Sequence, residues 1–205
     1  LKQGRLPEDR DTPILDLPCG EGAMVYALRE MGYHNVAGFD LDQGRLATGQ
    51  KLRLPIGPGE VFQLLADRPD GSVGCVLSMD FLEHLDKPQV VTFLAEALRV
   101  LEPGGRLIVR TPCADAPQGA SHVYNDFTHK WAATSGVLRQ LLTAAGFEGV
   151  EVFGEHPTWA MSYGLIRVPL FRLITGSANL LLRGAGLTPY VVWSSSMWGI
   201  GRKKR

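Results

Sequence analysis

Short apolar runs of strand length alternate with segments of helical periodicity over the first half of the chain. This alternation is typical of a parallel sheet covered on both faces, because each strand needs a crossover to reach its parallel neighbour. The clearest helix spans 87–101, where apolar residues recur on one stripe. The pattern predicts a doubly wound α/β fold. We expect strands at 13–17, 36–39, 61–65, 73–79 and 106–111, with helices near 23–31, 42–54 and 87–101.

The alternation of strand-length apolar runs and helical segments ends after Pro112. Residues 113–131 are polar and irregular, and we expect a long loop there, of the kind that often carries function at the carboxyl end of a strand. A helix near 134–145 follows, and then strands near 149–157 and 191–202. We expect these two strands to pair as an antiparallel ribbon at the edge of the sheet.

Residues 164–187 are the most unusual stretch. They are strongly apolar, and their only charged residues are Arg167, Arg172 and Arg183. Pro169 and Gly176 predict interruptions, which would make the stretch too broken to span a bilayer. Three interpretations stay open: a helical hairpin packed on the domain or on a homodimer partner, a lid over the acceptor site, and a cationic amphipathic element in peripheral membrane contact.

The turn LPCGEG after the first strand predicts a ligand site. Asp16 ends that strand, and Gly20 and Gly22 let the backbone approach a ligand that a Cβ would repel. A dinucleotide fingerprint needs a third glycine where this chain has Val25, and the Gly-Lys-Ser/Thr of a P-loop is missing. Asp40 ends the second strand, where a carboxylate can accept both ribose hydroxyls. The motif therefore predicts a nucleoside ligand whose cationic end lies near acidic side chains.

Composition narrows the class further. Lys+Arg and Asp+Glu are 21 each, so no global charge points to nucleic acid. The basic residues 201–205 are expected to form a solvated tail. Three cysteines form no CxxC pair, and no signal peptide is recognised, which favours a cytoplasmic protein. Because the chain opens with Leu1, it is also expected to be a piece of a longer protein.

Five motifs in this order resemble a class I S-adenosylmethionine-dependent methyltransferase over roughly residues 13 to 153: DLPCGEG, GFDLD, VLSMDFLEHL, LRVLEPGGRLIVRTP and TSGVLRQLLTAAGFEGVEV. The resemblance implies one domain over 1–205 with a Rossmann-like sheet of seven strands, mostly parallel, the last antiparallel. The helical insertion would precede that last strand. The implied cofactor is S-adenosyl-L-methionine.

The resemblance also implies roles for cofactor-binding residues. Asp16 and the backbone of Cys19, Gly20 and Gly22 would hold the methionine part, Asp40 would bind the ribose and Leu41 would pack on the adenine. Ser78 and Met79 would line the pocket near the sulfonium. The acid that usually contacts the adenine amine is poorly matched, with Asp67 and Glu60 as candidates. A second departure is Gly74, where an Asp is common.

The chemistry of a hydroxyl acceptor favours histidines as the catalytic residues. A hydroxyl acceptor must lose a proton, so a base or a metal would help, whereas a carbon or thiolate acceptor needs mainly alignment. We predict His84 and His129 as catalytic residues, with His122 a weaker candidate and Asp126 a partner. A divalent ion held by residues 80, 83 and 84 is a further alternative, but no second histidine follows at the expected spacing, so no metal is assigned.

The motifs EHL and NDFTH look most like methyltransferases that act on small molecules or on sugars of cell-surface polysaccharides. We therefore expect O-methylation of a glycan or small-metabolite hydroxyl. A quinol or phenol acceptor would suit the apolar insertion equally. A non-catalytic binding subunit and a nicotinamide oxidoreductase are the remaining alternatives, and Val25 and the lack of a Tyr-x-x-x-Lys pair count against the latter.

Overall fold

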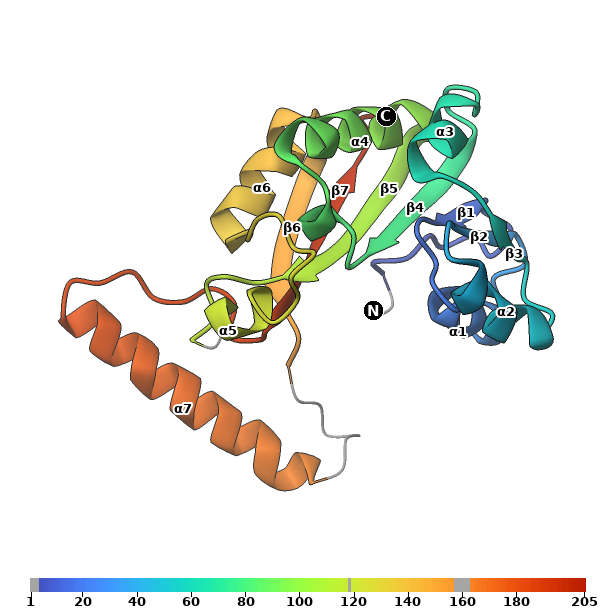
Figure 1. Cartoon of the computed structure of the whole chain (residues 1–205). Coiled ribbons are helices and arrows are strands. Elements are labelled where there is room, and N and C mark those ends of the chain that lie inside the picture. The colour runs from blue at the N-terminus through green and yellow to red at the C-terminus, as the bar shows by residue number, and fades with distance from the viewer. Residues whose placement is uncertain (1–3, 118, 157–162) are drawn as a thin grey trace.

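A seven-stranded sheet with the order β3-β2-β1-β4-β5-β7-β6 organises the molecule (Figure 1). The structure is a computed structural model that describes residues 4–117, 119–156 and 163–205. The strands are β1 Ile14–Asp16, β2 Val36–Asp40, β3 Ile56–Pro58, β4 Val73–Met79, β5 Leu101–Pro112, β6 Glu148–Gly154 and β7 Ser196–Arg202. β7 runs antiparallel to both β5 and β6, and the other pairs are parallel. The predicted fold class is confirmed, including the ribbon of the last two strands.

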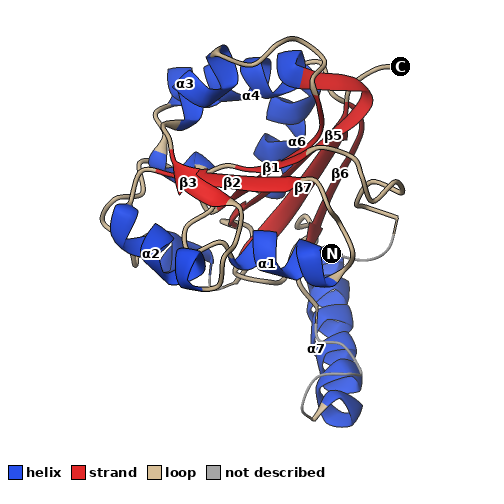
Figure 2. Ribbon diagram, turned by 90° about the vertical axis from the view of Figure 1, so that its right-hand side faces the viewer, coloured by secondary structure: helices blue, strands red, loops and turns tan. Residues whose placement is uncertain are grey.

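Helices cover both faces of this sheet (Figure 2). The helices are α1 Ala23–Glu30, α2 Gln43–Lys51, α3 Val61–Ala66, the short 3₁₀ helix η1 Leu82–His84, α4 Lys87–Val100, α5 Gly119–Val123, α6 Ser135–Ala144 and α7 Gly164–Gly184. α1 and α2 pack on one face, and α3, α4 and α6 pack on the other. The alternating strand residues therefore divide the core into two clusters.

Local capping signals explain several helix starts. The Asp42 side chain accepts hydrogen bonds from the amides of Gly44 and Arg45, so Asp42 caps α2 and Asp40 stays available for another role. Asp86 and Gln89 form a reciprocal capping box at the start of α4. Thr134 caps α6 through the amide of Val137.

The strand expected at 61–65 was wrong, because these residues form α3. Glu60 caps that helix by accepting from the amide of Gln63, and Val61 and Leu65 are buried one helical turn apart. The strand is β3 instead, which contains a glycine and a proline and pairs only with β2. Proline is tolerated there because β3 is an edge strand.

The insertion forms one helix, so the expected hairpin and its interruptions were wrong. α7 is 21 residues long and continues through Pro169, its sixth residue, and through Gly176. By length and composition α7 could cross a membrane, with a mean hydropathy of 1.4. The loop expected at 113–131 likewise contains the short helix α5.

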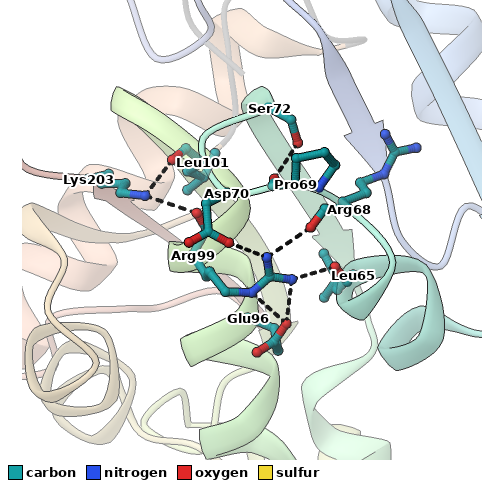
Figure 3. Close-up of polar contacts among 9 residues, drawn as sticks. All are labelled: Leu65, Arg68, Pro69, Asp70, Ser72, Glu96, Arg99, Leu101 and Lys203. Carbon is teal, nitrogen blue, oxygen red and sulfur yellow. Dashed lines mark hydrogen bonds and ion pairs between the residues drawn. The ribbon is translucent and has the colours of Figure 1, made fainter.

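A polar cluster lies at the end of the sheet where β4 and β5 begin (Figure 3). The Arg99 guanidinium donates to the carbonyls of Leu65 and Arg68 and contacts the carboxylates of Asp70 and Glu96. The Lys203 ammonium donates to the carbonyls of Arg99 and Leu101. The expectation of a solvated tail was therefore wrong for Gly201 to Lys203, the first two of which belong to β7.

Thr12 explains why Gly74 departs from the usual acid. A Cβ at Gly74 would lie 2.1 Å from Cγ2 of Thr12. We expect Gly74→Ala to lower the free energy of unfolding by about 1–3 kcal/mol through overpacking, as measured by urea titration. The same change should cost less in a Thr12→Ser background, which lacks that methyl group. Equal costs in both backgrounds would show that Thr12 is not the obstacle.

Candidate active site

Most of the predicted cofactor residues gather at one edge of the sheet. β1, β2 and β4 are parallel, so their carboxyl ends meet there, and the crossovers leave β1 and β4 in opposite directions. A crevice at such a switch point is where open α/β sheets bind ligands. Asp16, Asp40 and Met79 are the last residues of these three strands.

Asp16 is a buried carboxylate with spare hydrogen-bonding capacity. It is 1% exposed, and its Oδ1 atom has no hydrogen-bond partner within the described residues. Burial, with a further contribution from Asp40, raises its pKa from 3.8 to about 8. Such a carboxylate is costly unless a cation neutralises it, so the site fits the ammonium group of a methionine moiety.

The glycine turn and Asp40 hold each other in place. The amides of Gly20 and Asp42 each donate to one oxygen of the Asp40 carboxylate, both at 2.8 Å. Each oxygen keeps a further lone pair, so Asp40 can still accept ribose hydroxyls. Gly20 and Gly22 have φ values of 53° and 83°, which non-glycine residues rarely adopt. The turn therefore requires both glycines.

Cys19 has a structural role in this turn. Its amide donates to the carbonyl of Phe39 at 2.9 Å. Burial, together with Asp16 and Asp40, raises the pKa of its thiol to about 12. The thiol is therefore protonated at neutral pH, which argues against a nucleophile and for a small residue that fits the turn.

Strand alternation separates two residues that were expected to share the sulfonium pocket. Met79 and Leu77 lie on the face of β4 that belongs to the same core cluster as Cys19. Ser78 is fully buried and points to the opposite face, the side of α3 and α4, where its Oγ atom has no partner among the described residues. Met79 is therefore the side chain that shares a face with Asp16. Leu41, next to Asp40, is 68% exposed and available to cover an adenine.

The structure does not bring Asp67 to this edge. Asp67 ends α3, on the side that leads to the start of β4, and its carboxylate accepts from the Gln63 side chain. Glu60 lies two residues after the end of β3 at the carboxyl edge, where the amide of Gly59 donates to the carbonyl of Asp40. Position favours Glu60 over Asp67 as the acid nearest the adenine end.

A second group of side chains lies beyond the end of β4. His84 lies in η1, and His129 lies in the long loop after β5, yet their ring centroids are 4.8 Å apart. Two contacts fix the loop to η1: the amide of Lys130 donates to the carbonyl of Glu83, and the Trp131 indole donates to the carbonyl of Leu82. The fold thus brings the two predicted catalytic histidines together.

Hydrogen bonds define the tautomers of both histidines. Thr128 Oγ1 donates to the Asp126 carboxylate at 2.7 Å, so it must accept from Nδ1–H of His84 at 2.9 Å. Nδ1–H of His129 donates to the carbonyl of Val123 at 2.6 Å. Burial, and then His129, lower the pKa of His84. With Nδ1–H engaged in both rings, Nε2 is the nitrogen that can offer a lone pair, and Asp126 reaches His84 through Thr128 as a positioning group.

Glu83 completes this cluster, although it was not predicted as a catalytic residue. It is 2% exposed, its Oε2 atom accepts from the Thr111 hydroxyl at 3.0 Å, and its Oε1 atom has no partner in the described ranges. Burial is the main cause that raises its pKa to about 7. The signal in the sequence was its position beside His84, but burial could only be seen in the structure.

The same three residues could hold a divalent cation. One ligand atom each from Glu83, His84 and His129 lies within 4.8 Å of the others. Two imidazoles whose second nitrogen is anchored, together with one carboxylate, form a donor set that suits transition metals. Asp80 does not join them, because its carboxylate contacts Arg110 at 3.0 Å.

Sheet order and the glycine turn at the switch point define the fold class. A methyltransferase of Archaeoglobus fulgidus described as S-adenosylmethionine-dependent has a similar structure, with a TM-score of 0.73 and 19% identity over 94% of this chain and 86% of the other. The fold is that of the class I S-adenosylmethionine-dependent methyltransferases.

Sequence comparison gives the family. Residues 15–109 match the family described as a methyltransferase domain. A probable S-adenosylmethionine-dependent methyltransferase of Mycolicibacterium smegmatis is 33% identical over 146 residues, which are 69% of this chain and 54% of that protein. A ubiquinone biosynthesis O-methyltransferase of Maricaulis maris is 30% identical over 104 residues, 48% of this chain and 39% of that protein. The chain belongs to the class I S-adenosylmethionine-dependent methyltransferases, which confirms the expected cofactor, and it spans about half or less of these relatives.

The pKa of Asp16 predicts how cofactor binding depends on pH. An ammonium ligand requires the ionised carboxylate, which is the minor form below about pH 8. Affinity for S-adenosylhomocysteine should therefore rise by up to about tenfold per pH unit between about pH 6 and pH 8, and then level off. Calorimetry in buffers of different ionisation heat would detect the released proton. An affinity that is flat over this range would contradict the assignment of Asp16.

Proposed function

We propose that this protein transfers a methyl group from S-adenosylmethionine to a hydroxyl oxygen of a glycan or small-metabolite acceptor. The observation that carries the proposal is the cluster of Glu83, His84 and His129 beyond the end of β4, with two Nε2 atoms and one carboxylate oxygen that has no partner among the residues the structure describes. A hydroxyl needs a proton acceptor during transfer, whereas alignment alone suffices for a thiolate.

The roles follow from the contacts. Asp16 would bind the ammonium of the cofactor, Asp40 would bind its ribose, and Met79 would line the pocket near the sulfonium. Bound S-adenosylmethionine would supply the methyl group and leave as S-adenosylhomocysteine, and Nε2 of His84 or His129 would take the proton of the acceptor hydroxyl. The lowered pKa of His84 keeps its ring neutral and able to accept that proton. A divalent ion held by the cluster would instead polarise the hydroxyl.

A quinol or phenol is the second acceptor class. Its support is the similarity to the ubiquinone biosynthesis O-methyltransferase of Maricaulis maris and the apolar α7. Phenols ionise more readily than sugar hydroxyls, so they would depend less on the histidines.

Transfer of labelled methyl groups to panels of glycans, small alcohols, catechols and amines tests the function. Mass spectrometry should place the methyl group on oxygen. Transfer only to amines or to carbon would refute O-methylation. Binding of S-adenosylhomocysteine without transfer to any panel member would instead favour a non-catalytic binding subunit.

A further inference from the structure

α7 leaves most of its surface exposed. Only Gly164 and Val168 are buried among its 21 residues, and the helix projects from the rest of the molecule (Figures 1 and 2). Large apolar side chains at helical spacing form one continuous stripe, each between 50% and 74% exposed. The stripe consists of Ile166, Leu170, Leu173, Ile174, Leu180 and Leu181. An exposed apolar surface of this extent indicates an interaction site.

The opposite side of α7 faces the domain, so the stripe has a defined outward direction. The Phe171 ring packs against His156 with centroids 5.4 Å apart. The Asn179 side chain donates to the carbonyl of Tyr190 and accepts from its amide, at 3.2 and 3.0 Å. These contacts tie the helix to the chain just after β6 and to the chain that returns to β7.

The charged residues around α7 indicate what the exposed stripe binds. Residues 156–195 contain no Asp, Glu or Lys, and Arg167, Arg172 and Arg183 are their only charged side chains apart from histidine. Helices that pair with one another usually carry flanking charges of both signs. Apolar residues with arginines alone instead suit a bilayer whose lipids are anionic. We infer that α7 docks this protein on anionic membrane surfaces.

The connections at the two ends of α7 show how it would lie. The helix is about 32 Å long, enough for a hydrocarbon core. However, β6 before it and β7 after it belong to the same sheet, so a spanning helix would force residues 185–195 to cross back as irregular backbone. Exposed peptide groups in hydrocarbon are too costly for that path. α7 therefore lies along the interface.

An apolar hollow near the C-terminal end of α7 adjoins the stripe. It has a volume of about 460 Å³ and lies between the helix, residues 185–195 that return to β7, and the long loop after β5. It is lined by Ala178, Leu181, Leu182, Tyr190, Trp193 and Pro117. Because Pro117 belongs to the loop that carries His129, membrane docking would bring the acceptor side of the site close to lipid.

Vesicle flotation with the full chain tests the inference. Wild-type protein should bind vesicles that contain phosphatidylglycerol, and should bind pure phosphatidylcholine vesicles at least about tenfold less. The double variant L173E/L180E should lose binding by at least about tenfold. V91E/V137E is the matched control, because it adds the same charge at exposed apolar positions on α4 and α6; it should bind like wild type. All three proteins should retain S-adenosylhomocysteine binding, which shows that they are folded.

Wild-type protein that binds neither kind of vesicle would overturn the inference. Light scattering after gel filtration adds a second arm. A wild-type dimer that L173E/L180E converts to a monomer, without vesicle binding, would assign the stripe to a second copy of the chain. If wild-type protein bound anionic vesicles but transferred no methyl group to any acceptor, the proposed function would be contradicted and the membrane inference would stand.

Discussion

Replacing Asp16 with Asn is expected to weaken binding of S-adenosylhomocysteine by about 100-fold, or close to 3 kcal/mol. The substitution keeps the size of the side chain and removes the charge that would pair with the ligand ammonium. Asp16 is almost fully buried, so solvent screens that pair only weakly. Calorimetric titration at about pH 9, above the pKa of Asp16 and where most of the wild-type carboxyl is ionised, gives the clearest comparison.

Glu21→Gln is the matched control for this experiment. Glu21 lies in the same turn, but it is exposed. Its loss of charge should change affinity by less than about threefold, because exposed ion pairs contribute little. If Asp16→Asn bound the ligand as wild type does, the ammonium would have to be held elsewhere, and the interpretation of the first strand would fail.

Removing the acceptor-side histidines should abolish most turnover without affecting cofactor affinity. We expect His84→Ala and His129→Ala to lower kcat by about 10²- to 10⁴-fold, the usual contribution of a positioned base. His122→Ala is the control, because His122 is an exposed residue of α5, in the same connection after β5. Unchanged turnover in both His84→Ala and His129→Ala would refute the assignment of the base.

Two further measurements separate the base from a cation site. If the histidines act as bases, chelator-treated protein should keep its activity, and Thr128→Val should shift the pH profile by releasing His84 from Asp126. If the cluster holds a divalent ion, chelation should remove the activity and added Mn²⁺ or Zn²⁺ should restore it. Glu83→Gln should weaken metal binding in the second case, as measured by calorimetry with the metal alone.

Elements with strong local signals were predicted well. β4 and α4 have their expected positions because a long buried run and a capped amphipathic stripe are each encoded within one segment. The glycine turn with Asp16 and Asp40 was recognisable for the same reason. β3 and α3 were misassigned because the apolar run at 61–65 is too short to distinguish a strand from a helix.

Tertiary contacts decided what the sequence alone could not. His84 and His129 are distant in the chain, and only the docking of the loop on η1 brings their rings to 4.8 Å. The orientation of Ser78 depends on strand parity, and the glycine at position 74 depends on a methyl group of Thr12.

The sequence by itself therefore determined most of the order of the elements, the glycine turn and the two carboxylates expected to bind the cofactor, because hydrophobic periodicity, capping and turn geometry act over a few residues. Only the tertiary structure decided which acceptor-side groups meet, which of their nitrogens stay free and that the apolar insertion is one exposed helix. Burial and long-range hydrogen bonds depend on contacts between segments far apart in the chain, and no local pattern encodes them.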